Sequence, residues 1–129
     1  MAKKTILIME DESALQRLIS MIVEKSDFNS VAFDSGVEGL AWLAAGHHAD
    51  LVLLDLMMPG KNGIEVLEDM AKHGWLATTP VILLTGSIDE KLVLRGIELG
   101  AKDYLSKPFM PKDLIERVKK HLNESSSHP

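Results

Sequence analysis

The sequence predicts an α/β sandwich, in which helices cover both faces of a five-stranded parallel sheet. Three short apolar runs lie at residues 6–9, 51–54 and 81–84. None of them alternates with polar residues, which is typical of strands that are buried on both faces of a parallel sheet. Segments with the apolar spacing of amphipathic helices separate the runs, so strand and helix alternate along the chain.

Two weaker strand candidates, at residues 30–33 and 103–105, complete the predicted sheet. We expect a doubly wound, flavodoxin-like sheet with the strand order 2-1-3-4-5, because that order makes the first and third strands neighbours at a switch point. The chain shows no internal repeat and has the length of a single domain. We therefore expect one domain over residues 1–122, followed by a polar tail or the start of a linker over residues 123–129.

The predicted helices carry recognisable start and stop signals. Apolar residues recur at helical spacing over residues 15–23, with Ser13 as the expected N-cap. Ser35 begins a capping-box pattern, and Gly46 ends the helix that follows it. A third helical pattern covers residues 64–71. The remaining signals are Asp89 and Gly100 at the two ends of the fourth helix and Pro111 at the start of the fifth.

Composition excludes several classes of function. Fourteen basic and nineteen acidic residues give a net charge of -5, which disfavours direct nucleic-acid binding. The chain has no cysteine, so a disulfide framework and a thiol nucleophile are excluded. The first apolar run ends at Met9 and meets acidic residues, which makes it too short for a signal peptide, and no run approaches the ~20 residues of a membrane span. We expect a cytoplasmic protein that does not contact membranes.

Charged and hydroxyl side chains follow the predicted strands, at the edge where open α/β sheets bind ligands. These residues are Glu10, Asp11, Asp55, Thr85 and Lys107. Each one alone is typical of a turn or a helix cap. The predicted strand order brings Asp11 and Asp55 together, and two carboxylates ~4 Å apart repel by roughly 4 kcal/mol. A hard cation relieves this repulsion, and oxygen ligands favour Mg²⁺.

Four segments of the chain, each at a predicted strand end, resemble receiver domains of two-component response regulators, in particular the chemotaxis-regulator type. The segments are residues 6–12, 54–60, 84–86 and 100–109, and they occur in the same order as in that family. The resemblance covers residues 4–122. It implies a phosphoprotein that accepts a phosphoryl group from a phosphohistidine kinase with the help of Mg²⁺ and then changes its output face.

The resemblance also implies roles for matched positions. Asp55 would be the phosphoacceptor. Mg²⁺ would be held by Glu10 (through water), Asp11, Asp55 and the backbone carbonyl of Met57. Lys107 would contact the phosphoryl oxygens, and its bond to Pro108 would be cis. Thr85 would donate its hydroxyl to the phosphoryl group, and Tyr104 would be the aromatic residue that then moves inward.

Three positions bear on details of this resemblance. Met57 stands two residues after the phosphoacceptor, and Ser87 stands two residues after Thr85. In this family the residues at these two positions influence how fast the phosphoryl group hydrolyses. Neither side chain orients an attacking water strongly, so we expect a persistent phosphorylated state. Lys102 stands where some DNA-binding response regulators have an acidic residue in a charged dimer face, which disfavours that dimer here.

Two other functions compete with this interpretation. A phosphatase of the haloacid-dehalogenase type needs a second Asp two residues after the nucleophile, and Met57 occupies that position. We therefore expect a signalling domain that catalyses only its own phosphorylation and dephosphorylation. A pseudo-receiver that binds partners without phosphorylation remains the alternative. The expected partners are a sensor histidine kinase or phosphotransfer protein, and a downstream protein or linked output domain.

The five histidines lack the paired spacing of a metal site, and we expect them on the surface.

Overall fold

The structure, a computed structural model, describes residues 2–86 and 90–124 and the side chains of these residues up to Leu122. The predicted cap Asp89, the position of Ser87 and residues 125–129 lie outside the described residues. Within the described part of the chain, no helix is both long and apolar enough to cross a membrane.

Five parallel strands form a single sheet with the order β2-β1-β3-β4-β5, which confirms the predicted topology. The central strands β1, β3 and β4 contain the three apolar runs, and the two weaker candidates form the edge strands. The strand bounds are β1 Thr5–Met9, β2 Asn29–Phe33, β3 Leu51–Asp55, β4 Val81–Thr85 and β5 Asp103–Ser106.

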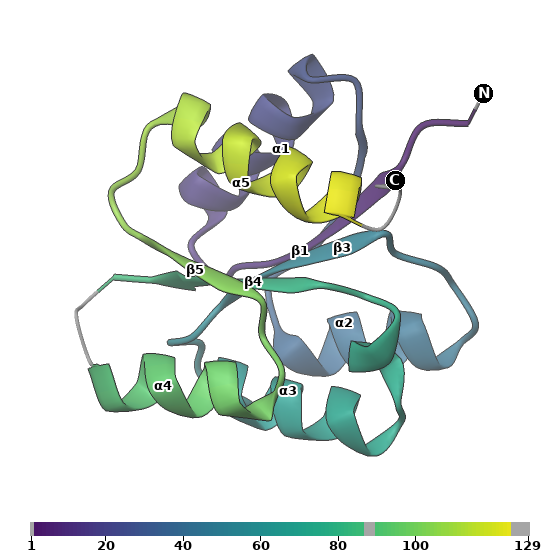
Figure 1. The fold of residues 1–129 in the computed structure, drawn as a ribbon, viewed down its shortest axis with the longest axis vertical. Helices are drawn as coiled ribbons and strands as arrows, with labels where there is room; N and C mark the ends of the chain where they lie inside the picture. Colours follow the sequence, from purple (N-terminus) through teal and green to yellow (C-terminus); the bar gives the residue numbers. More distant parts are fainter. Residues whose placement is uncertain (1, 87–89, 125–129) are drawn as a thin grey trace.

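Helices cover both faces of the sheet, with α1 and α5 on one side and α2, α3 and α4 on the other (Figure 1). A short 3₁₀ helix, η1, lies between α3 and β4. The bounds are α1 Ser13–Lys25, α2 Gly36–Ala44, α3 Gly63–Lys72, η1 Trp75–Ala77, α4 Glu90–Leu99 and α5 Pro111–Glu124. Helix α5 thus continues two residues past Leu122, into the stretch expected to be a polar tail.

Each central strand contributes to two separate hydrophobic clusters. In β1, Ile6 and Ile8 belong to the cluster beneath α1 and α5, whereas Leu7 and Met9 belong to the cluster above α2 and α3. Successive side chains of a strand point to opposite faces, so a strand covered on both sides must be apolar at every position. This requirement explains why the runs do not alternate in sequence.

The helix signals are partly confirmed. Ser35 caps α2, where its side chain accepts a hydrogen bond from the Glu38 amide at 3.2 Å. Ser13 is not the cap of α1, because the helix begins at Ser13 itself and Glu12 occupies the cap position without a side-chain bond. Gly100 follows α4 with a φ of +128°, a left-handed conformation that glycine adopts at little energetic cost.

A capping box that the sequence analysis did not identify begins α3. The Asn62 side chain accepts a hydrogen bond from the Glu65 amide, and the Glu65 side chain accepts one from the Asn62 amide, both at 3.0 Å. The next residue, Gly63, lies so close to the sheet that an added Cβ would stand 2.7 Å from the Asp55 carbonyl oxygen. The first turn of α3 is therefore fixed directly behind the end of β3.

Candidate functional site

Asp55 is the last residue of β3, and it lies at the switch point of the sheet. In the sheet, Asp55 pairs with Leu84 of β4. The preceding residue, Leu54, pairs with Met9 of β1. Asp55 is 2% exposed. Its Oδ1 accepts a hydrogen bond of 3.1 Å from the backbone amide of Met57. This bond fixes one oxygen of the Asp55 carboxylate, which lies at the rim of the sheet.

The loop after β1 carries the other two carboxylates, and several hydrogen bonds hold it in place. Glu10 is fully buried, with 0% exposure, and its Oε2 accepts from the Glu12 amide at 3.1 Å. The carbonyl oxygen of Glu10 accepts from Nε2 of Gln16 at 3.1 Å, and its amide donates to the Phe33 carbonyl oxygen at 3.1 Å. Strand β2 and helix α1 therefore both position the acidic loop.

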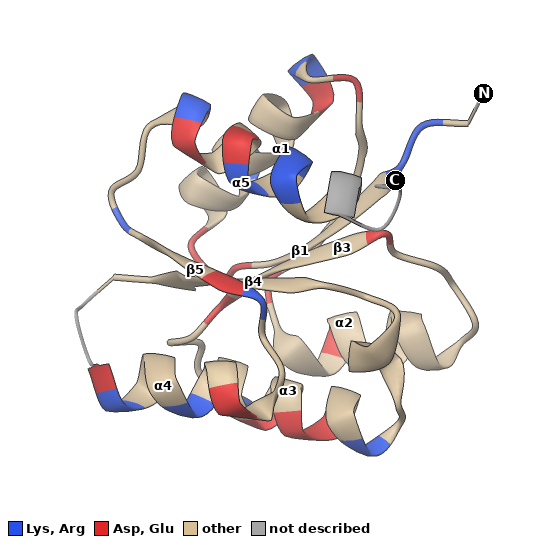
Figure 2. Cartoon of the chain, in the orientation of Figure 1, with Lys and Arg blue, Asp and Glu red and all other residues tan. Residues whose placement is uncertain are grey.

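Glu10, Asp11 and Asp55 converge as the strand order predicted. One carboxylate oxygen from each residue lies within 4.8 Å of the others. Among the described residues this is the only group of three His, Cys, Asp or Glu side chains with such a spacing. Figure 2 shows acidic segments beside the labels of β4 and β5 and on the helices around the sheet. Three carboxylates at this separation repel one another, and the repulsion favours either a bound cation or a retained proton.

Lys107 supplies a positive charge to the same pocket. Its Nζ lies 2.8 Å from Oε1 of Glu10 and 3.3 Å from Oδ1 of Asp55. The peptide bond between Lys107 and Pro108 is cis, as the family resemblance implied. Burial by itself lowers the pKa of Lys107, but the contacts with Glu10 and Asp55 outweigh it, and the pKa is raised. The lysine is therefore charged at neutral pH.

One acceptor in the pocket remains available. The contact between Lys107 and Oε1 of Glu10 has the distance of an ion pair without the alignment of a hydrogen bond. Among the described residues, Oε1 of Glu10 has no hydrogen-bond partner although it is buried. Lys107 supplies this oxygen with positive charge, but a buried carboxylate oxygen that lacks an aligned donor can still accept from water or contact a bound cation. The donor set, which consists entirely of oxygen, fits a hard divalent cation.

Burial has the largest effect on the protonation of Asp55. It raises the pKa of the carboxyl group; the Met57 amide and Lys107 lower it, whereas Glu10 and Asp11 raise it further. The net result is a pKa of about 7 without a cation. Protonated and ionised forms of Asp55 therefore coexist near neutral pH.

The two residues expected to form the switch lie on neighbouring strands. Thr85 is the buried last residue of β4, and its neighbour across the ladder is Ser106 of β5. Tyr104 lies two residues earlier on β5, beside Leu83, and its side chain is 45% exposed. The tyrosine ring borders a hollow of about 340 Å³ whose other lining residues are Glu90, Val93, Leu94 and Ile97.

One expectation about the histidines is wrong. His121 lies on α5 with only 6% exposure, and its Nε2 is 2.9 Å from Oδ2 of Asp103. The sequence contains a signal for this burial, because His121 stands three residues after Val118 and seven after Leu114, on the apolar stripe of α5. A buried polar residue on such a stripe needs a hydrogen-bonding partner, and the partly buried Asp103 provides it.

Comparison with known proteins agrees with this geometry. The family model described as response regulator receiver domain matches residues 6–119 of this chain. The phosphate regulon transcriptional regulatory protein PhoB of Escherichia coli is 36% identical over 121 residues, which cover 90% of this chain and 50% of that protein. The DNA-binding response regulator MtrA of Mycobacterium tuberculosis is 33% identical, with 98% of this chain and 54% of that protein covered. The chain thus spans about half the length of these curated relatives.

A solved structure extends the comparison to the whole fold. The CheY-like response regulator receiver domain protein from Methanospirillum hungatei superposes with a TM-score of 0.90 at 29% identity, covering 97% of this chain and 98% of that one. A doubly wound parallel sheet with this acidic pocket is the architecture of a two-component signalling receiver. The chain belongs to the response regulator receiver domain family.

Proposed function

We propose that Asp55 accepts a phosphoryl group from a phosphohistidine donor with the help of Mg²⁺. The observation that supports this most strongly is the convergence of Glu10, Asp11 and Asp55 within 4.8 Å. A carboxylate at the end of a strand, at the rim of the sheet, is a competent nucleophile for an aspartyl phosphate. The donor would be a sensor histidine kinase or a phosphotransfer protein.

In the proposed reaction, an oxygen of the Asp55 carboxylate attacks the phosphorus atom. The bond between phosphorus and the donor imidazole breaks, and the imidazole nitrogen takes up a proton. Lys107, already 3.3 Å from Oδ1 of Asp55, stabilises the negative charge on the phosphoryl oxygens. The amide of Met57 holds the carboxylate in a fixed orientation.

The cation in this proposal would be held by Asp11 and Asp55, by Glu10 through water, and by the carbonyl of Met57. When bound, Mg²⁺ neutralises charge on the phosphoryl oxygens during transfer. Asp55 must also lose its proton before it attacks, because a protonated carboxyl group is a poor nucleophile. Burial, together with Glu10 and Asp11, raises the pKa of Asp55 to about 7 and thus links the reaction to pH.

We further propose that the domain catalyses only its own phosphorylation and dephosphorylation. The side chain of Met57 is 60% exposed and cannot act as a general acid for turnover of external substrates. It also cannot orient a water molecule strongly, so the phosphorylated state persists. The output would be a downstream protein or a linked domain, consistent with relatives whose names describe transcriptional and DNA-binding regulators.

The switch in this proposal couples Thr85 to Tyr104. A phosphoryl group adds negative charge and strong acceptor oxygens near the end of β4, and the Thr85 hydroxyl moves to donate to them. The space that Thr85 leaves then allows the Tyr104 ring to move from its exposed position to an inward one. The face formed by α4, β5 and α5 changes shape as a result, and a partner reads that change.

Labelling with a small phosphodonor and Mg²⁺ tests the acceptor. Mass spectrometry should show the gain of one phosphoryl group by the wild type and none by Asp55→Asn, which keeps the shape of the side chain and removes the nucleophile. Asp27→Asn is a matched control, because Asp27 is exposed and has a φ of +73° that asparagine tolerates. Undiminished labelling of Asp55→Asn would exclude this acceptor, and an unlabelled wild type would favour the pseudo-receiver.

Amide chemical shifts with and without Mg²⁺ and beryllofluoride, a stable mimic of the phosphoryl group, test the switch. Thr85→Ala should still respond at Met57, beside the acceptor, because it retains the carboxylates and Lys107. Its response at Tyr104 should be lost, since the hydroxyl that couples the two strands is gone. Equal responses at Tyr104 in Thr85→Ala and the wild type would contradict the proposed coupling.

A further inference from the structure

The edge strand β5 is attached to α5 by a cluster of polar side chains. Among residues 2–86 and 90–124, β5 pairs only with β4, so no strand of this described part supports its other side. Asp103 begins β5, and its Oδ1 accepts hydrogen bonds from the Tyr104 amide at 2.8 Å and from Nη1 of Arg117 at 3.0 Å. Nη1 of Arg117 also donates to the carbonyl oxygen of Tyr104. The amide and the carbonyl oxygen of Tyr104 are therefore both hydrogen-bonded to this cluster.

His121 completes the cluster from one helical turn further along α5. Its Nε2 lies 2.9 Å from Oδ2 of Asp103, so both carboxylate oxygens have partners on α5. Burial raises the pKa of Asp103, but the hydrogen bonds from His121, the Tyr104 amide and Arg117 outweigh burial, and the pKa is lowered. Asp103 is thus an ionised, multiply bonded group between the strand and the helix.

Apolar contacts also join α5 to the sheet. Leu114, Val118 and Leu122 are buried in the cluster of apolar residues beneath α1 and α5. These apolar contacts hold α5 against the sheet, but they are not directional. Hydrogen-bonded ion pairs are directional, so the Asp103 cluster fixes the position of α5 relative to Tyr104.

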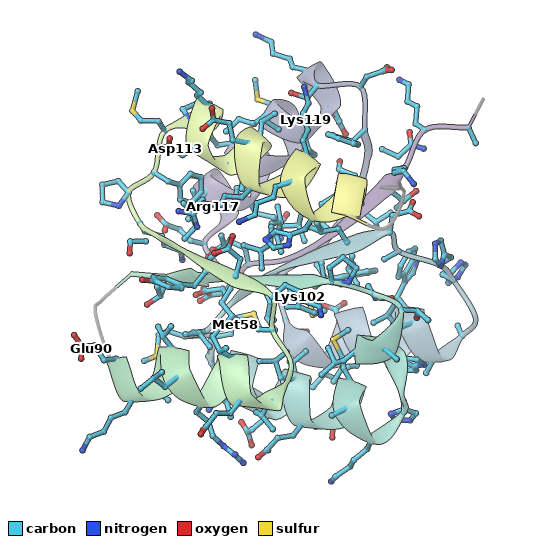
Figure 3. All side chains as sticks on the ribbon, viewed as in Figure 1. Met58, Glu90, Lys102, Asp113, Arg117 and Lys119 are labelled. Carbon is cyan, nitrogen blue, oxygen red and sulfur yellow. The ribbon has the colours of Figure 1, made fainter. Side chains whose placement is uncertain are left out.

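We propose that Asp103, Arg117 and His121 form a clamp that makes α5 move together with β5, so that Arg117 and His121 are positioning residues for the signal. The proposal rests on the proposed switch at Tyr104. Without the clamp, a movement of β5 is absorbed locally in the strand. With it, the movement reaches the C-terminal half of α5. Arg117 reaches from α5 toward β5 in Figure 3.

Amide chemical shifts of the full chain, with and without Mg²⁺ and beryllofluoride, test the clamp. Arg117→Gln removes the charge and the bond to the Tyr104 carbonyl. Lys119→Gln is the matched control, because it removes one positive charge from the exposed surface of the same helix, where no ion pair is formed among the described residues. We expect the beryllofluoride response at Val118 and Leu122 to fall at least about two-fold in Arg117→Gln and to be unchanged in Lys119→Gln.

Conservative variants separate the clamp from a purely structural role. Arg117→Lys retains the charge and should recover part of the response in α5. His121→Gln retains a donor in a neutral side chain and provides a second test if Arg117→Gln does not fold. A full response of α5 in folded Arg117→Gln would overturn the clamp. The clamp would also be overturned if, in the wild type, Met57 responds to beryllofluoride and α5 does not. If the wild type shows no response at Met57, the proposed function is overturned together with the clamp.

Discussion

At the scale of single residues, the pocket combines two opposing requirements in Asp55. The side chain must be buried to be held in one orientation, and it must be ionised to act as a nucleophile. Burial and the neighbouring Glu10 raise its pKa, whereas Lys107 and the Met57 amide lower it, and the pKa of about 7 reflects that balance. The carboxylate is therefore energetically unfavourable in the domain without a cation.

This balance predicts how the stability of the cation-free domain depends on pH. The pKa of Asp55 is about 7 in the folded domain, above its ordinary value of 3.8, so between these values the folded state retains a proton that the unfolded state has lost. Stability contributed by this group therefore falls as the pH rises toward 7 and stays low above it. Asp55→Asn should stabilise the domain by about 1 to 3 kcal/mol at pH 8 and by much less at pH 5.

Urea unfolding with a chelator present, at pH 5 and at pH 8, measures this difference. Asp27→Asn is again the control, because its exposed carboxylate lies outside the pocket. If Asp55→Asn stabilises the domain equally at both pH values, the proposed raised pKa of Asp55 is wrong.

Residue-level prediction from sequence succeeded where side chains follow buried strands. The strand order brought Glu10, Asp11 and Asp55 together, because parallel strands end at a common edge. His121 was missed because the expectation considered only metal spacing and solvent exposure. Its place on the apolar stripe of α5 was visible, but its partner Asp103 is 18 positions away in the sequence, and only the fold brings the two together.

At the scale of elements, α3 supports the pocket from behind. Its first turn starts with the Asn62 and Glu65 capping box and approaches the Asp55 backbone at Gly63. The pattern of an Asn followed three residues later by Glu was present in the sequence, so this start was predictable in principle. By contrast, Ser13 was wrongly expected to cap α1, because the bonded loop around Glu10 brings the chain into helical conformation one residue earlier.

The capping box predicts a measurable contribution of α3. Asn62→Ala leaves the Glu65 amide without its acceptor and should lower the free energy of unfolding by about 1 kcal/mol. Asn62→Asp keeps an acceptor and adds a negative charge at the helix N-terminus, so it should be close to the wild type or slightly more stable. Urea unfolding compares the three proteins. Equal stability of Asn62→Ala and the wild type would show that the box does not stabilise α3.

At the scale of the whole molecule, the pocket at the carboxyl ends of the strands and the proposed output face share the edge strand β5. Hydrophobic clusters on both sides hold the central strands rigidly, so the strand ends are well positioned. The edge strand β5 has fewer constraints and connects Lys107, in the pocket, with Tyr104 and the Asp103 cluster. The same strand thus belongs to the site and to the face on which the proposed signal is read.

The last prediction concerns the linkage of cation, proton and folding across the domain. A cation that enters the pocket at pH 6 must displace the proton that Asp55 holds, because the carboxyl pKa is about 7. At pH 8 the carboxylate is already free, so Mg²⁺ should bind up to about tenfold more tightly at pH 8 than at pH 6. Because the cation binds the folded state, the Tm should rise more on adding Mg²⁺ at pH 8 than at pH 6. Calorimetry at the two pH values measures this rise, and Asp55→Asn, which has no proton to displace, should lose most of the difference. A wild-type rise that is the same at both pH values would contradict proton displacement from Asp55.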